Sequence, residues 1–494
     1  MADGTALTLR HAGHLLRHTG FGASQAAAAA FLADHPTRGD AVNALLSFKP
    51  AGFKPGGREL ADIHDKWIRY MVKVKFPLQE KLVLFWHDHF ATGFSKVRDA
   101  KLMSAQNKLF RTGCKGNFKA LVKALNLDPA MMEFLDTVRN HEEVPNENYA
   151  RELQELFTLG VKDSAGVDNY RQADVAQIAR AFTGWDYDKL AFFKDYDHDY
   201  YDSGNGNHAD RGPKIVYQST GGFGPAGRNL AANGEGEAEI GTVVDIIFEH
   251  TDSQGKNTVA RRTARRLIEY FAHPNPTLSY IDDVVAASGF DTGFELTALL
   301  HAIFVHDDFY LTAAAPVGAA TPKSVRWPVD YVVTSLRLLK MKLKGKDQYV
   351  DGGSYGRVLD QLTNMGQIVF DPPSVFGWNW ETAWVSSSTM LARYGFARDL
   401  TAARGGGGTS FRPDKLMSLD LTDPNDILVA AMDVLGIPGG VTGDLTASEK
   451  GLLVAYLTDN GANLTLDLND YDTRNSKLHG LFALLMQTPA YQLQ

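Results

Sequence analysis

Apolar residues recur at spacings of three and four along most of this chain, and this spacing constrains the fold more than any other feature. The clearest stretches are 102–125, 175–182, 259–271, 296–311 and 329–343. Alternating strand patterns are few. The sequence therefore predicts a mainly α fold: a large multi-helix assembly with long irregular loops and few short strands.

Two segments interrupt the helical pattern and suggest how the chain is divided. Residues 186–236 are rich in Asp, Gly, Asn and Tyr, which predicts a long loop insertion. The Gly405–Gly408 run is typical of a flexible joint. We expect a helical core over 1–404, a Gly-rich linker over 405–413 and a small C-terminal helical unit over 414–494.

The composition is that of a globular protein and excludes several classes. The 494 residues are 44% hydrophobic and carry 50 Lys and Arg against 58 Asp and Glu, so the net charge of −8 argues against a nucleic-acid partner. Cys114 is the single cysteine, which excludes an intramolecular disulfide. No apolar run approaches the roughly 18 residues of a membrane helix. No export or targeting signal is visible at the N-terminus.

The segment from Pro145 to Gly160 is the most informative stretch. Asn146 is a good N-cap and Gly160 a good helix stop. On a helical wheel one apolar stripe contains Tyr149, Leu153, Leu156, Phe157 and Gly160. The sequence therefore predicts an amphipathic helix between the two signals.

The charged residues of this helix have two interpretations. Glu147, Arg151 and Glu155 follow at steps of four, as in a surface ion ladder. Asn148 and Glu152 share another side, and Glu152 borders the apolar stripe. Because a carboxylate at the edge of a core must find a partner or shift its pKa, Glu152 is the leading candidate for a functional acid. A structural tie is the alternative.

A His-x-His pair lies in a second segment, 80–90, whose apolar residues cover every side and predict a buried helix. On a straight helix His87 and His89 point about 200° apart, so they could share one ion only if the helix ends or unwinds there. They are either core histidines or an acid–base or metal site, with Glu152 as a further ligand.

The long loop holds two candidate polar sites. The oxygens of Asp195, Asp197 and Asp199 suit calcium, although the residues that follow do not complete an EF-hand. Further on, the loop brings an imidazole, a carboxylate and an ammonium together at His208, Asp210 and Lys214. This second group is either a substrate-contacting segment or a solvated loop tip.

Three of the seven tryptophans lie within seven residues, and two of them, Trp378 and Trp384, are candidate substrate contacts. Exposed indoles stack on sugar rings, whereas buried indoles fill a core. The common nucleotide-binding and hydrolase motifs are missing: there is no Walker loop, no Gly-x-Ser-x-Gly elbow and no His-Glu-x-x-His.

Ordered short motifs give the chain a family resemblance. They include 14–22, 85–90, 106–111, 116–118, 128–131, 145–160, 180–185, 264–267, 365–367 and 377–378. Together they resemble the bacterial family called domain of unknown function 1800. The resemblance implies a mainly helical fold, frequent export, and a partner from the neighbouring family, domain of unknown function 1501. It also adds Arg151 and Trp185, which lie within its motifs, as candidate substrate contacts.

From these residues our leading hypothesis is a hydrolase that acts on a polymer, with carbohydrate as the candidate substrate. Glu152 would be the acid or base, Glu147 or Asp210 the second carboxylate, and His89 would orient or relay the proton. Asn148, on the same side of the helix as Glu152, is a further catalytic candidate. The sequence requires no cofactor. One alternative is a divalent-metal enzyme with histidine and glutamate ligands, and another is a non-enzymatic scaffold that binds a partner of the 1501 family.

Overall fold

The structure is a computed structural model, and it describes residues 3–188, 193–195, 210, 212–230, 237–313, 323–341, 343, 358–402, 411–439 and 444–494. Regular structure in these ranges is almost entirely helical, and the four short strands found there form two separate antiparallel pairs. The predicted fold class, mainly α with few short strands, is confirmed. No helix within these ranges has the length and apolar character needed to cross a membrane.

The first half of the chain contains a run of helices that ends at the long loop. These are α1 (Leu9–His18), α2 (Gln25–Asp34), α3 (Arg38–Leu46), α4 (Leu60–Lys73), α5 (Pro77–His89), α6 (Phe94–Val97), α7 (Ala100–Gly113), α8 (Phe118–Leu125), α9 (Pro129–Phe134), η1 (Thr137–Arg139), α10 (Asn148–Glu152), the π-helical segment η2 (Leu153–Thr158) and α11 (Gln172–Ala181).

The second half is again helical. It contains α12 (Glu237–Glu249), α13 (Thr258–Phe271), α14 (Leu278–Ser288), α15 (Phe290–Gly293), α16 (Leu296–Val305), η3 (Asp307–Tyr310), α17 (Pro328–Leu338), α18 (Val358–Asn364), η4 (Glu381–Trp384), α19 (Ser387–Thr401), η6 (Pro413–Lys415), α20 (Pro424–Leu435), α21 (Ala447–Leu457), α22 (Tyr471–Gln487) and α23 (Pro489–Gln492).

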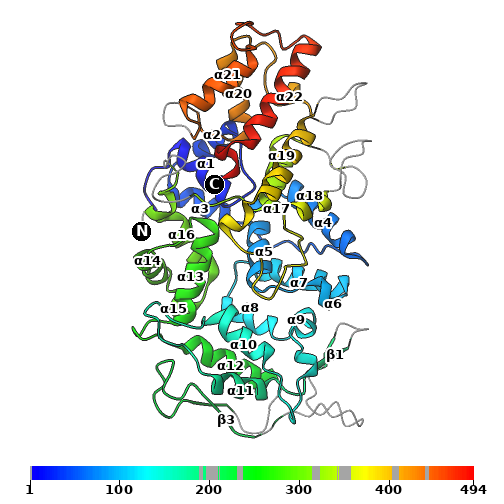
Figure 1. Ribbon diagram of the computed structural model, residues 1–494. Coiled ribbons are helices and arrows are strands. Elements are labelled where there is room, and N and C mark those ends of the chain that lie inside the picture. Colours follow the sequence, from blue (N-terminus) through cyan, green and yellow to red (C-terminus); the bar gives the residue numbers. More distant parts are fainter. Residues whose placement is uncertain are drawn as a thin grey trace.

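The helices form an elongated body with α20 to α22 at one end and α11, α12 and β3 at the other (Figure 1). Helix α5 lies near the middle, and all its residues from Leu78 to His89 are buried. The predicted burial of the 80–90 helix is therefore confirmed. A helix that is apolar on every side is stable only when other elements surround it.

A buried ion pair fixes α5 against its neighbours. Glu80 of α5 accepts hydrogen bonds from Arg111 of α7 at 2.7 and 2.8 Å, and neither side chain is exposed to solvent. The indole Nε1 of Trp67 in α4 donates to the same carboxylate at 2.7 Å. A charge pair removed from water is tolerated only when further hydrogen bonds satisfy it, and this carboxylate has them from Trp67 and from the amide of Gln79 at 2.8 Å.

The long loop contains both strand pairs. Strand β1 (Asp186–Asp188) pairs with β2 (Phe193–Asp195), and β3 (Lys214–Val216) pairs with β4 (Arg228–Leu230), with Ile215 opposite Asn229. Strand β3 packs against α11. Of the predicted calcium ligands, Asp195 is the last residue of β2, while Asp197 and Asp199 lie outside the described residues, as does His208.

The C-terminal segment packs closely against the rest of the chain. Helix α22 lies along α19, and α20 contacts α2 (Figure 1). The backbone N–H of Gln494 donates to the carbonyl of Ser324 at 2.9 Å, and Arg393 donates to Gln492 at 2.9 Å. The predicted division into a core and a separate C-terminal unit remains a prediction, and residues 403–410 of the joint lie outside the described ranges.

Candidate functional site

The segment that carries Glu152 changes its helical geometry at that residue. Helix α10 begins at Asn148, one residue later than the N-cap signal at Asn146 predicts, and the side chain of Asn146 instead accepts from the N–H of Asn148 at 2.9 Å in a turn. From Leu153 the helix widens into η2, where the N–H of Leu159 reaches back five residues to the carbonyl of Gln154 at 2.8 Å. Such π turns occur frequently at functional sites.

Side chains on the inner face anchor this segment in the core. Tyr149, Leu153 and Phe157 are buried, as the predicted apolar stripe requires. The amide of Gln154 is also buried; it accepts from the hydroxyl of Tyr217 at 2.9 Å. The inner face of the segment is therefore fixed by contacts with the core.

The last carbonyls of the segment bind side chains from two other helices. The Nη2 of Arg262 in α13 donates to Leu156 O at 3.2 Å, and the Nε2 of His89 in α5 is 3.1 Å from Phe157 O. Carbonyls at a helix end have no intrahelical partner and need one from elsewhere. Gly160 ends the segment with φ of +81°, which confirms the predicted stop.

The predicted ion ladder forms at its first step only. Glu147 pairs with Arg151 at 2.9 Å and also accepts from Gln172 at 2.6 Å, so both charges of this pair are engaged. Glu155 instead accepts a hydrogen bond from the hydroxyl of Tyr170 at 3.0 Å. Sequence spacing gave no signal for Tyr170, because it comes from the loop that follows.

Glu152 differs from its neighbours in having no hydrogen bond or ion pair within the described part of the chain. Its side chain is half-buried, and its oxygens are not among the buried unpaired atoms, so solvent reaches them. Burial and the nearby charge of Glu155 raise the pKa of Glu152 to about 7, against the opposing effect of Arg151. This carboxyl group is therefore partly protonated at neutral pH.

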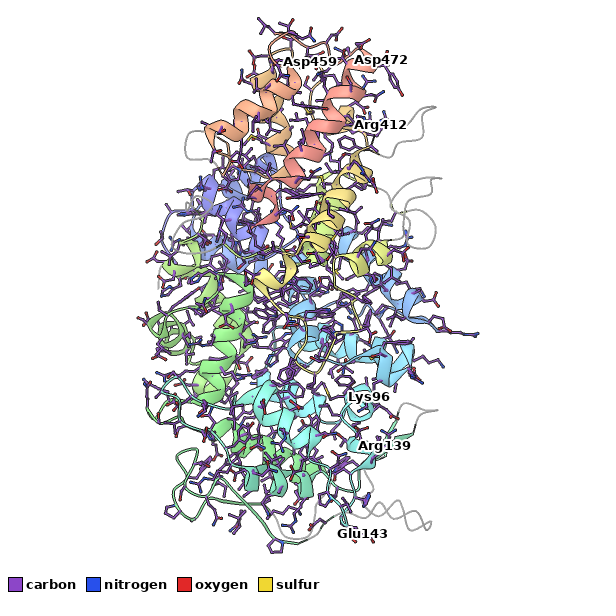
Figure 2. The ribbon with its side chains drawn as sticks, in the orientation of Figure 1. Lys96, Arg139, Glu143, Arg412, Asp459 and Asp472 are labelled. Atoms are coloured by element: carbon purple, nitrogen blue, oxygen red, sulfur yellow. The ribbon has the colours of Figure 1, made fainter. Side chains whose placement is uncertain are left out.

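Asn148 does not act together with Glu152 in this structure. Its amide lies 3.4 Å from Asp136, which also pairs with Lys96 at 2.7 Å and with Arg139 at 2.5 Å. Lys96 and Arg139 lie on the same side of the molecule in Figure 2. Asn148 thus belongs to a surface polar cluster centred on Asp136.

The two histidines of α5 serve different neighbours. The Nε2 of His87 accepts from the N–H of Phe370 at 2.7 Å, whereas His89 contacts the π segment. Burial lowers the pKa of His87 to about 3 and holds the pKa of His89 well below its usual range, so both rings are neutral at pH 7. The structure thus matches the core-histidine alternative for His87, while His89 reaches the backbone of the candidate segment.

The metal-site alternative lacks its ligand geometry. Within the ranges that the structure describes, no three His, Cys, Asp or Glu side chains are placed to hold one metal ion. His87, His89 and Glu152 are therefore not brought together as ligands. The helix does end at His89, but the two imidazoles are directed to different backbone groups.

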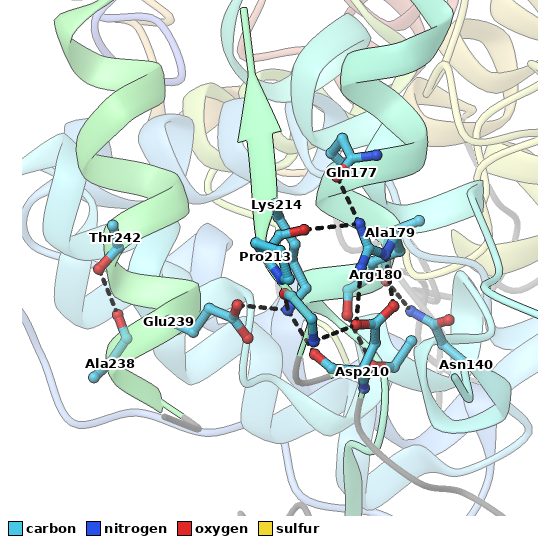
Figure 3. Close-up of polar contacts among 12 residues, drawn as sticks. Asn140, Gln177, Ala179, Arg180, Asp210, Pro213, Lys214, Ala238, Glu239 and Thr242 are labelled. Atoms are coloured by element: carbon cyan, nitrogen blue, oxygen red, sulfur yellow. Dashed lines mark hydrogen bonds and ion pairs between the residues drawn. The ribbon is translucent and has the colours of Figure 1, made fainter. Parts of the chain in front are cut away.

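Asp210 and Lys214 lie in a polar cluster that ties the long loop to α11 and α12 (Figure 3). Asp210 accepts from Arg180 at 2.6 and 3.0 Å. The Nζ of Lys214 donates to Glu239 at 2.8 Å, and both of these side chains are fully buried. Because the ammonium has no exposed surface, Lys214 makes structural contacts rather than the predicted substrate contact. Asp210 forms its ion pair with Arg180 and not with a partner of Glu152.

The candidate tryptophans are core residues. Trp185, Trp378 and Trp384 are all buried, so they offer no face to a sugar ring. The indole of Trp380 is covered by the guanidinium of Arg266, whose Cζ lies 3.9 Å from the ring centroid. Of the two interpretations of these indoles, the structure supports core packing.

Asp88, which sequence reasoning passed over, holds this tryptophan loop in place. It accepts from the N–H of Trp378 at 2.9 Å and from the indole of Trp380 at 3.0 Å, and Arg266 lies 3.7 Å away. Burial raises the pKa of Asp88 to about 6, although Arg266 opposes the shift. The glycine at 377, next to Trp378, was the sequence signal for a close contact here. A Cβ at Gly377 would lie 2.4 Å from the carboxylate of Asp88.

Comparison with known proteins agrees with the motif pattern. A family model described as "Protein of unknown function (DUF1800)" matches residues 14–493, nearly the whole chain. No curated protein and no solved structure matches the chain.

Proposed function

The chain belongs to the DUF1800 family, and from the contacts of its own residues we propose that it is a hydrolase in which Glu152 performs acid–base chemistry on a polymeric substrate. The observation that carries the proposal is the state of Glu152: a half-buried carboxyl without a partner in the described chain, open to solvent, with a pKa of about 7. An acid with a pKa near the working pH can both donate and accept a proton.

Glu155 supplies the second carboxylate of the proposed site. It lies close enough for its charge to raise the pKa of Glu152, and the hydroxyl of Tyr170 fixes its position. Glu147, the second carboxylate expected from sequence, is engaged by Arg151 and Gln172 instead. A fixed carboxylate beside a protonated one is the arrangement that stabilises developing positive charge in glycoside hydrolysis.

Solvent reaches the carboxyl group of Glu152 on α10, so a polymer too large to be enclosed could contact it. Carbohydrate is the polymer that we propose as the substrate. The buried tryptophans contribute no support for sugar stacking. The rigid backing of the segment by Gln154 and His89 supports the proposal, because a reactive group must be held in a fixed place.

Release of reducing ends from a panel of soluble polysaccharides tests the proposal. We expect Glu152→Gln to lower turnover at least about 100-fold, since positioned proton transfer contributes that much. Glu147→Gln is the matched control, since it alters a neighbouring half-buried glutamate that is already paired. Failure of the wild type to cleave any polymer, or equal activity of Glu152→Gln, would refute the proposed function.

A further inference from the structure

A cavity of about 410 Å³ lies beyond the end of the π segment. The loop that begins at Leu159 forms one wall, and α13 and α14, which pack together, form the others. Leu278 and Ile281 of α14 contribute apolar surface, and Ser164 and Thr258 also line the cavity. A cavity of this size accommodates a small organic molecule.

The lining carries more positive charge than its own carboxylates neutralise. Four cations line it: Lys162, Arg261, Arg262 and Arg265. Arg261 is neutralised by Asp252 at 2.7 Å and by Asp282 at 2.6 Å. The other lining carboxylate, Asp163, accepts backbone N–H groups of its own loop and of Ser253, so it is turned toward the backbone.

The remaining cations are weakly paired within the described chain. Arg265 has a single ion pair there, 3.9 Å long, with Glu269. Lys162 pairs with Asp168 at 3.1 Å, but both side chains are more than half exposed, so water screens the pair. Two cations thus face the cavity with little compensation.

Arg262 has a buried donor without a partner. Its Nη2 donates to Leu156 O, but its Nε is buried and has no hydrogen-bond partner among the described residues. Burial and the nearby Arg266 lower the pKa of Arg262 to about 10, so this guanidinium is poorly solvated. Arg262 therefore lines the cavity as a cation with little solvation and with one donor that no described group satisfies, and this favours an anion beside it.

We propose that this cavity binds a small organic anion through an oxyanion group, either phosphate or carboxylate. Arg262 and Arg265 would donate to the oxyanion, because the guanidinium fork matches both groups. Leu278 and Ile281 would contact the apolar part of the ligand. The N-terminus of α13, which begins at Thr258, adds a favourable dipole. The proposed anion site does not depend on the proposed hydrolysis. Its test measures binding and not turnover.

Calorimetric titration of the full chain at low salt tests the site with three probes of similar size. These are phenyl phosphate, benzoate and the neutral benzyl alcohol. We expect one of the two anions to bind and the alcohol not to bind, and the tighter anion identifies the preferred group. Higher salt should weaken the binding of the anion.

Variants then assign the binding to this cavity. Arg265→Gln should weaken anion binding about tenfold or more, as expected for the loss of a charge-assisted hydrogen bond. Lys162→Gln, at an exposed position, should also weaken it and serves as the second variant if Arg265→Gln does not fold. Arg412→Gln is the matched control; Arg412 is an exposed arginine near the α20–α22 end of the molecule (Figure 2), it does not line the cavity, and its substitution should leave binding unchanged.

Three outcomes would overturn the proposed site. The first is that neither anion binds. The second is that benzyl alcohol binds as tightly as the anions, which would indicate an apolar cavity only. The third is that Arg265→Gln and Lys162→Gln both bind with wild-type affinity, which would place the anion elsewhere.

Discussion

Two glutamates at the two ends of α10, Glu147 just before it and Glu152 as its last residue, show how surroundings decide the chemistry of a residue. Glu147 and Glu152 are five residues apart, yet Glu147 is satisfied by Arg151 and Gln172 while Glu152 has no such partner in the described chain. Sequence spacing correctly placed Glu152 at the border of the apolar stripe. It could not identify Tyr170 as the partner of Glu155, because that contact depends on the loop after the helix.

At Glu152 we predict a pH-dependent effect on stability. Its pKa is about 7 in the folded protein against an ordinary value of 4.5, so the folded state binds this proton more tightly than the unfolded chain does. The free energy of unfolding therefore falls at this position as pH rises between those values. Because glutamine cannot ionise, Glu152→Gln should gain about 1 kcal/mol relative to wild type between pH 5 and pH 8, after allowance for solvent screening.

Urea unfolding at both pH values measures this difference. Glu147→Gln is the control, and its stability relative to wild type should not rise with pH in the same way. A constant difference between wild type and Glu152→Gln across this range would show that Glu152 titrates normally.

Asp88 allows a second prediction at this scale. Asp88→Ala removes the acceptor of two N–H groups, the buried backbone N–H of Trp378 and the part-buried indole N–H of Trp380. We expect a loss of about 2 to 4 kcal/mol in the free energy of unfolding, because unsatisfied buried donors are costly. Asp371→Ala, which removes an exposed acceptor of the Ser95 N–H, should cost clearly less, and equal losses would contradict this role for Asp88.

At the scale of the element, the π segment could not have been predicted. Apolar spacing indicated one helix from 146 to 160, and both an α-helix and a π turn satisfy the same stripe over so short a stretch. What distinguishes them is tertiary: the carbonyls of Leu156 and Phe157 are bound by Arg262 and His89 from other helices. The stop at Gly160, by contrast, was readable because glycine favours positive φ.

Gly160 and Gly166 provide a matched pair for testing this arrangement. Both have φ near +80°, but a Cβ at Gly160 would lie 2.7 Å from Nη1 of Arg262, whereas none of the described atoms lies within 4 Å of the corresponding position at Gly166. Both alanine variants should be strained by the backbone conformation. We expect Gly160→Ala to cost about 1 kcal/mol more than Gly166→Ala in chemical denaturation; equal costs would show that Arg262 moves aside freely.

At the scale of the whole molecule, sequence predicted the class of fold but not its assembly. The 3.6-residue periodicity gives helices, and the all-round apolar segment 80–90 gives a central helix. Periodicity does not reveal that the last residues return to Ser324 and Arg393, since such contacts join segments far apart in the chain. For the same reason, the sequence suggested that Lys214 could contact substrate, whereas in the structure it is buried in an ion pair with Glu239.

Arg393 tests how firmly the C-terminus is tied to the body. This fully buried arginine donates to Gln492 at 2.9 Å and to the carbonyl of Arg326 at 2.7 Å. Arg393→Met keeps the apolar stem but leaves both acceptors unpaired, so we expect a loss of about 2 to 4 kcal/mol. Hydrogen exchange in residues 489–494 should accelerate in the variant, and unchanged protection there would mean that other contacts hold the C-terminus.

The most direct test of the account is titration of the Glu152 carboxyl carbon by NMR in glutamate-labelled protein, with the signal assigned by its loss in Glu152→Gln. The account predicts an apparent pKa of about 7 in the folded protein. A midpoint near the ordinary value of 4.5 would mean that Glu152 is a fully solvated surface carboxylate, and the proposed acid–base chemistry would then lack its proton donor.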